Sequence, residues 1–258
     1  MPLLRLLLTT ALTLGSARLL AHEVSVLHTE WWLRGPEVRS WQTGLTGEAT
    51  LSPDRALLLH TDHMERFELR EARRGLGYRH RLEHGYWQLT HAQGDHNDIL
   101  AVRDTRLELG RALMQGLSGM LALKAQGFAP SDVHQLALAL EYETASGWLV
   151  LPSLNLGRAT YFAPAKTQDI WGASLRFGRY REEDWRVWAY YGLAEEAQAQ
   201  AIENQTRALK TSSFGARGEK NLARHWLVAL ELSRQFYPAL DLRFETASAQ
   251  LTYRWGKR

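Results

Sequence analysis

The chain has 258 residues, a formal net charge of +3 at pH 7 and no cysteine. This length allows one or two soluble domains or a single membrane barrel. The missing cysteines exclude a disulfide framework, a thiolate metal site and a cysteine nucleophile. The mean hydropathy is −0.34, and no segment beyond the amino terminus has the uncharged apolar run that a membrane helix needs. A β-barrel wall escapes this test, because only every second residue faces lipid.

Residues 1–21 have the layout of a secretory signal peptide. Arg5 precedes an apolar run at 6–14, and small residues follow at Ala17 and Ala21. We expect cleavage after Ala21, with cleavage after Ala17 as the alternative; an amphipathic first helix is the competing interpretation. Cleavage removes two arginines and lowers the formal charge from +3 to +1. The basic composition therefore gives no reason to expect nucleic-acid binding.

Apolar and polar residues alternate through the remaining chain, 22–258, in segments of about ten residues, the length of a tilted membrane strand. In 40–51, Trp41 and Leu45 lie on one face, whereas Gln42 and Glu48 lie on the other. Similar segments follow at 117–126, 134–143, 171–177, 185–191, 226–232 and 244–255. The segments predict about 14 strands, with 12 as the alternative. Alternation is weakest in 24–33 and 55–66.

The connections between these segments alternate between tight breaks and longer polar stretches. The tight breaks lie near 52–54, 83–85, 114–116, 145–147, 181–184 and 218–223. The longer stretches lie near 34–39, 68–73, 92–98, 128–133, 162–169, 193–207 and 237–243. Bacterial barrels place short turns in the periplasm and longer loops outside. We therefore predict an all-β fold, a single antiparallel transmembrane β-barrel in the outer membrane of a Gram-negative bacterium, with both termini periplasmic.

The aromatic residues and the last segment support this prediction. Trp41, Trp87, Trp148 and Trp226 lie near segment ends, as interfacial girdles require. A soluble β-sandwich with an aromatic core is the competing fold. Outer-membrane proteins commonly end in a strand with an aromatic residue near the terminus, and 244–255 fits, although three further residues follow it. We expect outer-membrane lipids and lipopolysaccharide around the wall, and the barrel-assembly machinery at this strand.

Several stretches of this sequence follow one another in the same order as similar stretches in one known family. They are Ser-Trp-Gln at 40–42, Glu-Arg-Phe at 65–67, the hairpin at 113–123 with Gly116 and Gly119, and 214–219 leading through Trp226 to Tyr253 and Trp255. In these the chain resembles the YaiO family of outer-membrane β-barrels over most of the mature sequence. The resemblance implies location and fold, and it transfers no catalytic residue. The family's association with exopolysaccharide and envelope functions suggests exopolysaccharide as a partner.

Two clusters of histidine and aspartate are the enzyme-like feature of the sequence. They are His60, Asp62 and His63, then His91, Asp95, His96 and Asp98. A lipid or peptide hydrolase at the outer rim could use His60, Asp62 and His91, since histidine serves as a general base near neutral pH. A divalent metal is a second alternative. Neither cluster has a spacing that demands these roles, so we expect solvated residues, no enzyme, no metal and no cofactor.

Charged residues on the predicted inward face suggest what the barrel does. They are Arg79, Arg81, Arg106, Glu108, Lys124, Glu141, Glu143, Arg176, Arg186, Glu231 and Arg254. Such charges either pair across strands and close the lumen, or leave one sign free to select solutes. Because both signs alternate between neighbouring segments, we favour a largely self-paired lumen. The leading hypothesis is a porin-like passive or gated path, or an envelope-associated barrel without enzymatic activity.

Overall fold

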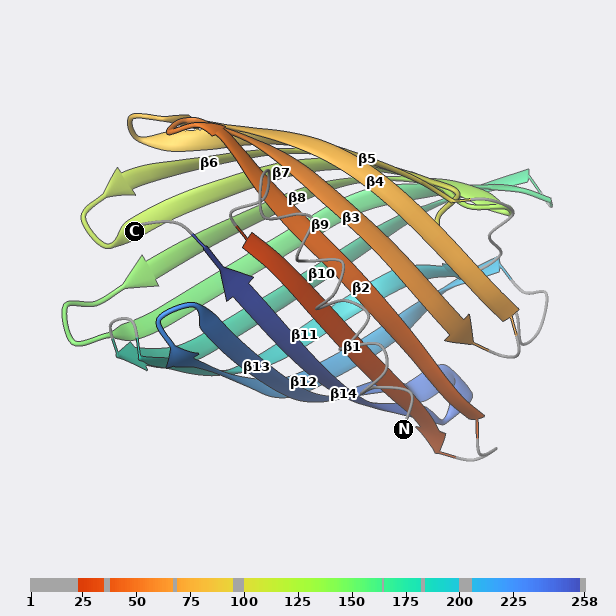
Figure 1. Cartoon of the computed structure of the whole chain (residues 1–258). Coiled ribbons are helices and arrows are strands. Elements are labelled where there is room, and N and C mark those ends of the chain that lie inside the picture. Colours follow the sequence, from red (N-terminus) through yellow and green to blue (C-terminus); the bar gives the residue numbers. More distant parts are fainter. Residues whose placement is uncertain are drawn as a thin grey trace.

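The computed structural model is a closed antiparallel β-barrel of 14 strands, which confirms the predicted fold class (Figure 1). The structure describes residues 23–34, 38–66, 69–94, 100–163, 165–181, 184–199 and 206–255. The predicted signal peptide, 1–21, lies outside them. Within these described ranges, no helix is long and apolar enough to cross a membrane.

Each strand pairs with its neighbours along the chain, and β1 pairs with β14 to close the barrel. The strands are β1 (Glu23–Arg34), β2 (Val38–Ser52), β3 (Arg55–Arg66), β4 (Leu69–Leu82), β5 (Gly85–Gly94), β6 (Arg103–Met114), β7 (Leu117–Gly127), β8 (Ser131–Glu143), β9 (Trp148–Phe162), β10 (Ala165–Arg181), β11 (Trp185–Ala199), β12 (Thr206–Ala223), β13 (Trp226–Tyr237) and β14 (Leu242–Arg254). A single 3-10 turn, η1 (Pro238–Leu240), precedes β14. The two segments with the weakest alternation are therefore strands.

The barrel has two unlike ends. Because the number of antiparallel strands is even, β1 begins and β14 ends at one rim, which we call the terminal rim; the opposite end is the loop rim (Figure 1). Tight turns close the terminal rim. In two of them glycine takes a left-handed conformation, with φ +73° at Gly116 and +80° at Gly147, which L-residues with a Cβ adopt only at a cost.

The structure corrects the predicted connections. β4 already begins at Leu69 and β10 at Ala165, β11 continues to Ala199, and β12 continues to Ala223. Most of 68–73, 162–169 and 218–223 is therefore strand. Residues 193–199 are strand as well, neither loop nor helix. Ladder hydrogen bonds join backbone groups whatever the side chains, so pairing continues into stretches whose polar side chains suggested loops.

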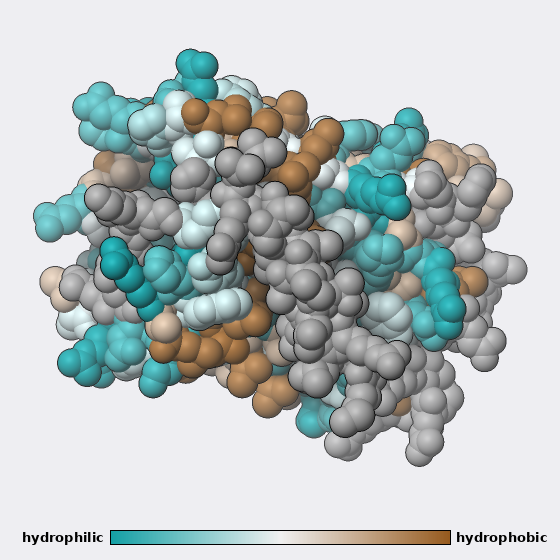
Figure 2. Space-filling model, in the orientation of Figure 1, coloured by the Kyte–Doolittle hydropathy of each residue, from teal (hydrophilic) through white to brown (hydrophobic). Residues whose placement is uncertain are grey.

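The outer face of the barrel is apolar. Residues that pair across strands point to the same side, so Leu59 and Leu76 lie beside each other, with 52% and 66% of their surface exposed. Leu230 and Leu232 on β13 are also more than 60% exposed. In Figure 2, hydrophobic side chains gather midway along the visible face and hydrophilic side chains toward its ends. This is the surface of a wall that faces lipid.

Apolar side chains also fill the inside of the barrel toward the loop rim. Two buried clusters lie there, one of Leu33, Leu209, Tyr237 and Phe244, the other of Val133, Ala159, Tyr161 and Ile170. Tyr161 is only 1% exposed and Ala159 is fully buried. These apolar clusters share the interior at this end with charged side chains that are largely shielded from water, such as Glu71 and Arg73.

Candidate functional site

The interior toward the terminal rim holds a cavity of about 1120 Å³. The two sides of its wall differ. Charged residues line it on β4, β6 and β7, namely Arg79, Arg81, Arg106, Glu108 and Lys124. β8, β9 and β10 contribute mainly small or neutral residues, namely Ala137, Ala139, Ser153, Asn155 and Ser174, together with the charged Glu141 and Arg176. The space exists because these short side chains do not reach across the lumen.

Ion pairs hold the charged side of the cavity in place. Arg79 and Arg81 both pair with Glu48 of β2, the latter at 3.9 Å. Arg106 pairs with Glu108 on its own strand. The side chains of Glu48, Arg79 and Glu108 are 13–23% exposed, so these contacts are partly shielded from water. Their effect is to fix the direction of the guanidinium groups.

Tyrosine rings packed flat against glycine make room for these polar contacts. Tyr86 pairs in register with Gly110, and a Cβ at Gly110 would lie 2.2 Å from the Tyr86 ring. The hydroxyl of Tyr86 donates to Glu108. On the far side of the barrel, the Tyr190 ring likewise covers Gly215, and its hydroxyl donates to Glu231 at 2.9 Å. Both tyrosines therefore lie along the wall and leave the lumen free.

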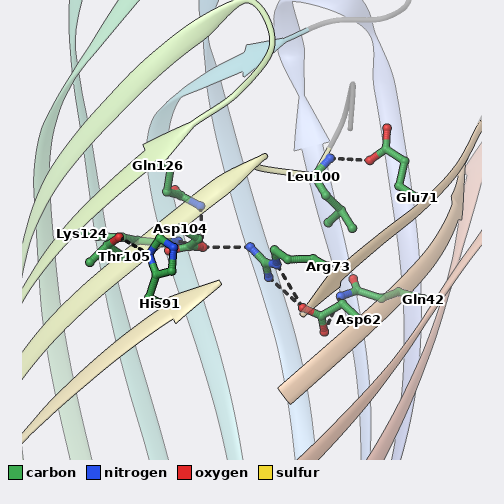
Figure 3. Close-up of polar contacts among 10 residues, drawn as sticks. All are labelled: Gln42, Asp62, Glu71, Arg73, His91, Leu100, Asp104, Thr105, Lys124 and Gln126. Carbon is green, nitrogen blue, oxygen red and sulfur yellow. Dashed lines mark hydrogen bonds and ion pairs between the residues drawn. The ribbon is translucent and has the colours of Figure 1, made fainter. Parts of the chain in front are cut away.

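A second network, nearer the loop rim, is centred on Arg73 of β4. The guanidinium donates to Asp62 Oδ2 at 2.8 Å and to Asp104 Oδ2 at 2.9 Å (Figure 3). Gln126 also donates to Asp104, at 3.0 Å, and Lys124 lies 3.9 Å from the same oxygen. The side chains of Arg73 and of both aspartates are no more than 16% exposed. This cluster ties β3, β4, β6 and β7 together inside the barrel.

A third network lies on the opposite wall. Arg217 Nη2 donates to Glu219 at 2.9 Å and to the Gln250 side-chain oxygen at 2.7 Å. Its Nη1 lies 3.5 Å from Glu231. The network joins β12, β13 and β14 and, through Tyr190, β11 as well. The residues that line the cavity come from β4 to β10, so this network lies outside the cavity lining.

The strand register puts all the predicted inward charges on the inner face of the barrel. Seven of them line the cavity, namely Arg79, Arg81, Arg106, Glu108, Lys124, Glu141 and Arg176. Arg254 instead pairs with Glu23 at the terminal rim, at 2.7 Å. Among the described residues, Glu141, Glu143, Arg176 and Arg186 have no ion-pair partner. On the β4 to β7 side of the cavity, the charged side chains form ion pairs. Beside the small residues of β8 to β10, Glu141 and Arg176 have no ion-pair partner among the described residues.

The candidate hydrolase residues do not come together. His60 and Asp62 point into the lumen, where Asp62 is held by Arg73. His91 lies on the outer face, with Nδ1 2.8 Å from the Thr105 hydroxyl. His63 is also on the outer face, since it pairs with Thr43 and Ala72. Asp95, His96 and Asp98 lie outside the described residues. No group of three or more metal-binding side chains occurs in the described part of the chain.

Sequence reasoning missed the residues that complete the networks. They are Glu48, Arg73, Tyr86, Asp104, Tyr190 and Arg217. Alternation could have found some of them, since Asp104 is two residues from Arg106 on the same face. Arg73 was assigned to a loop because the polar stretch around it hid the start of β4. The hydroxyl of Tyr86 contacts the neighbouring strand and that of Tyr190 reaches across one strand, contacts that no local sequence pattern records.

Comparisons with known proteins bear on the fold of the chain. No family model and no curated protein matches the chain, so the YaiO resemblance stays a prediction. Similar solved structures cover nearly the whole chain. One is a bacterial polysaccharide outer membrane secretin, with TM-score 0.58 and 11% identity over 91% of this chain and 98% of that one. Another is a loop-deletion mutant of OmpT, an outer membrane protein of Vibrio cholerae, with TM-score 0.55 and 8% identity over 90% and 98%.

A third is an anion-selective porin from Comamonas acidovorans, with TM-score 0.51 and 9% identity over 90% of this chain and 98% of that one. Identities this low establish the fold alone. The chain therefore has the fold of outer-membrane β-barrels.

Proposed function

We propose that this protein is a non-enzymatic outer-membrane channel with a gated path for small polar solutes. The terminal rim faces the periplasm, because bacterial barrels place both termini and their tight turns there. The observation that carries the proposal is the polar cavity of about 1120 Å³ on the inner wall of β4 to β10. A barrel that served only as a structural plug would not need this space.

The apolar clusters inside the loop rim supply the gate. Hydrophobic constrictions block ions by excluding water, and small movements of their side chains restore conduction. Tyr161, packed against Val133 and Ile170, is the largest fully buried side chain of the described residues. In this hypothesis solutes in the cavity are separated from the outside by these side chains, and conduction is intermittent.

The charges beside the cavity favour anions. Arg176 has no ion-pair partner among the described residues, and Lys124 shares its nearest carboxylate, Asp104, with Arg73. Glu141 is the opposing free charge in the wall. Since the cavity wall has more cationic than anionic side chains, we expect a modest preference for anions.

Single-channel recording in planar bilayers tests the proposal. The purified barrel should give discrete current steps whose reversal potential in a salt gradient indicates weak anion selectivity. A barrel that is silent at all voltages, with folding confirmed by its heat-sensitive migration on gels, would instead support a closed structural role.

A carbohydrate path is a second candidate. Ser153 and Ser174, joined by a hydrogen bond of 2.7 Å, and Asn155 form a hydroxyl- and amide-rich strip on the cavity wall, chemistry that suits sugar hydroxyls. The polysaccharide secretin named above has the same fold, and exopolysaccharide fits the association of the YaiO family. Current blockade by added oligosaccharide would support this candidate, and unchanged current would count against it.

A further inference from the structure

An arginine on the outer wall has no ion-pair partner among the described residues. Arg111 of β6 is exposed on the outer face and pairs in register with Gly85 on one side and Gly119 on the other. Along its own strand, its outward neighbours are Leu109 and Leu113. No carboxylate of the described residues lies within ion-pair distance of Arg111. A charge on such an apolar surface is costly unless an anion or water reaches it.

Beside Arg111 the outer wall is hollowed into an apolar groove of about 910 Å³. Its floor is one register row across five strands, consisting of Trp87, Leu109, Leu121, Leu138 and Leu154. Arg111 lies one outward position nearer the terminal rim than this row. The groove thus has a cationic end toward the rim and an apolar end toward the middle of the wall.

Gly119 gives the groove its depth. A Cβ at Gly119 would lie 3.3 Å from Leu113 Cδ1 and 3.7 Å from Leu140 Cδ2, so these side chains pack close to the sheet only because position 119 has no side chain. The other charged groups at the groove, Glu83 and His84, lie 3.6 Å apart in an exposed turn. Arg111 therefore remains the cation available to a ligand.

We propose that this groove binds one phospholipid of the periplasmic leaflet, with its phosphate on the Arg111 guanidinium and an acyl chain along the leucine row. The proposal rests on the membrane orientation given under the proposed function, but not on conduction. Charge complementarity carries it: guanidinium groups bind phosphate through paired hydrogen bonds, and basic pockets beside apolar walls hold lipid head groups.

Native mass spectrometry of the full mature barrel in detergent, titrated with dioleoyl phosphatidylglycerol, tests this site. We expect one saturable lipid adduct. Arg111→Ala should weaken it about tenfold, the loss of a charge-assisted contact. Gly119→Leu should abolish it by pushing Leu113 and Leu140 into the groove. Arg179→Ala is the matched control, because Arg179 is another outward arginine near the terminal rim but stacks on Trp148 at 5.4 Å.

Diacylglycerol and glycerol phosphate, offered separately, should both bind far more weakly than the intact lipid. Heat-sensitive gel migration verifies that each variant is folded. If Arg111→Ala folds poorly, the lipid adduct of Gly119→Leu still tests the site. Equal adducts in all variants would mean nonspecific lipid and overturn the proposal, as would a protein dimer that displaces lipid. If the unmodified barrel binds the lipid but gives no current in planar bilayers, the proposed channel is refuted and the lipid site stands.

Discussion

The two halves of the barrel interior are built from the same strands but filled differently. Toward the loop rim, Tyr161, Ile170, Tyr237 and Phe244 are buried against apolar neighbours. Toward the terminal rim, the same inward positions carry charges and small residues around a cavity of about 1120 Å³. Ion pairs occur in both halves, but apolar packing fills much of the loop-rim half, whereas short side chains leave space in the terminal-rim half. In the proposed channel, the loop-rim half stabilises and closes the barrel, and the terminal-rim half contacts the solute.

Removing Arg73 should be one of the two most destabilising changes. Arg73→Met leaves Asp62, 16% exposed, without its cation and leaves Asp104 with Lys124 alone, at 3.9 Å, so we expect a cost of about 3–5 kcal/mol. Urea unfolding in lipid vesicles measures this. Arg176→Met is the matched control from the terminal-rim half and should change stability by no more than about 0.5 kcal/mol. Equal losses in the two variants would contradict the division between the halves.

Opening the loop rim should come next. Tyr161→Ala removes a side chain that is 1% exposed, so we expect a loss of about 3–5 kcal/mol together with larger and more frequent current steps in planar bilayers. Tyr161→Phe is the control. The Tyr161 hydroxyl is buried without a hydrogen-bond partner among the described residues, so phenylalanine should keep stability and current. Unchanged current in Tyr161→Ala would place the gate elsewhere.

Filling the glycine beneath His60 should have an intermediate effect. A Cβ at Gly75 would lie 1.9 Å from the imidazole ring, so Gly75→Ala should displace His60 and cost about 1–3 kcal/mol. Gly47→Ala is the outer-face control. Its nearest contacts would be 3.9–4.0 Å away, and we expect no loss or a small gain. Thermal unfolding followed by gel migration distinguishes the two variants, and equal midpoints would be the contrary result.

Reversing one free charge in the cavity should have the smallest effect on stability and a clear effect on selectivity. Arg176→Glu changes a lining residue that has no ion pair among the described residues, so unfolding should be nearly unchanged. The reversal potential in a salt gradient should move toward cation preference, since rings of charge select ions by sign. An unmoved reversal potential would show that ions do not pass this wall.

The alternating pattern determined much of this protein from the sequence by itself. Period-two alternation gives the faces of Arg106 and Lys124 directly, because successive side chains of a strand point to opposite sides. It also gives the number of strands, since each segment of about ten residues spans the wall once. It failed where strands continued past the apolar span, which is why Arg73 was assigned to a loop although its backbone pairs with Asp62.

Only the tertiary structure decided which side chains of the inner face contact one another. The hydrolase hypothesis joins His60 and Asp62 of one cluster with His91 of the other, but the register sends His91 to the outer face and Asp62 to Arg73. The pairing of Arg73 with Asp104, 31 residues apart, and the covering of Gly215 by Tyr190 depend on which strands become neighbours. Alternation specifies a side of the sheet, whereas closure of the barrel specifies the partners, and partners determine whether a charge is paired, free or exposed to a cavity.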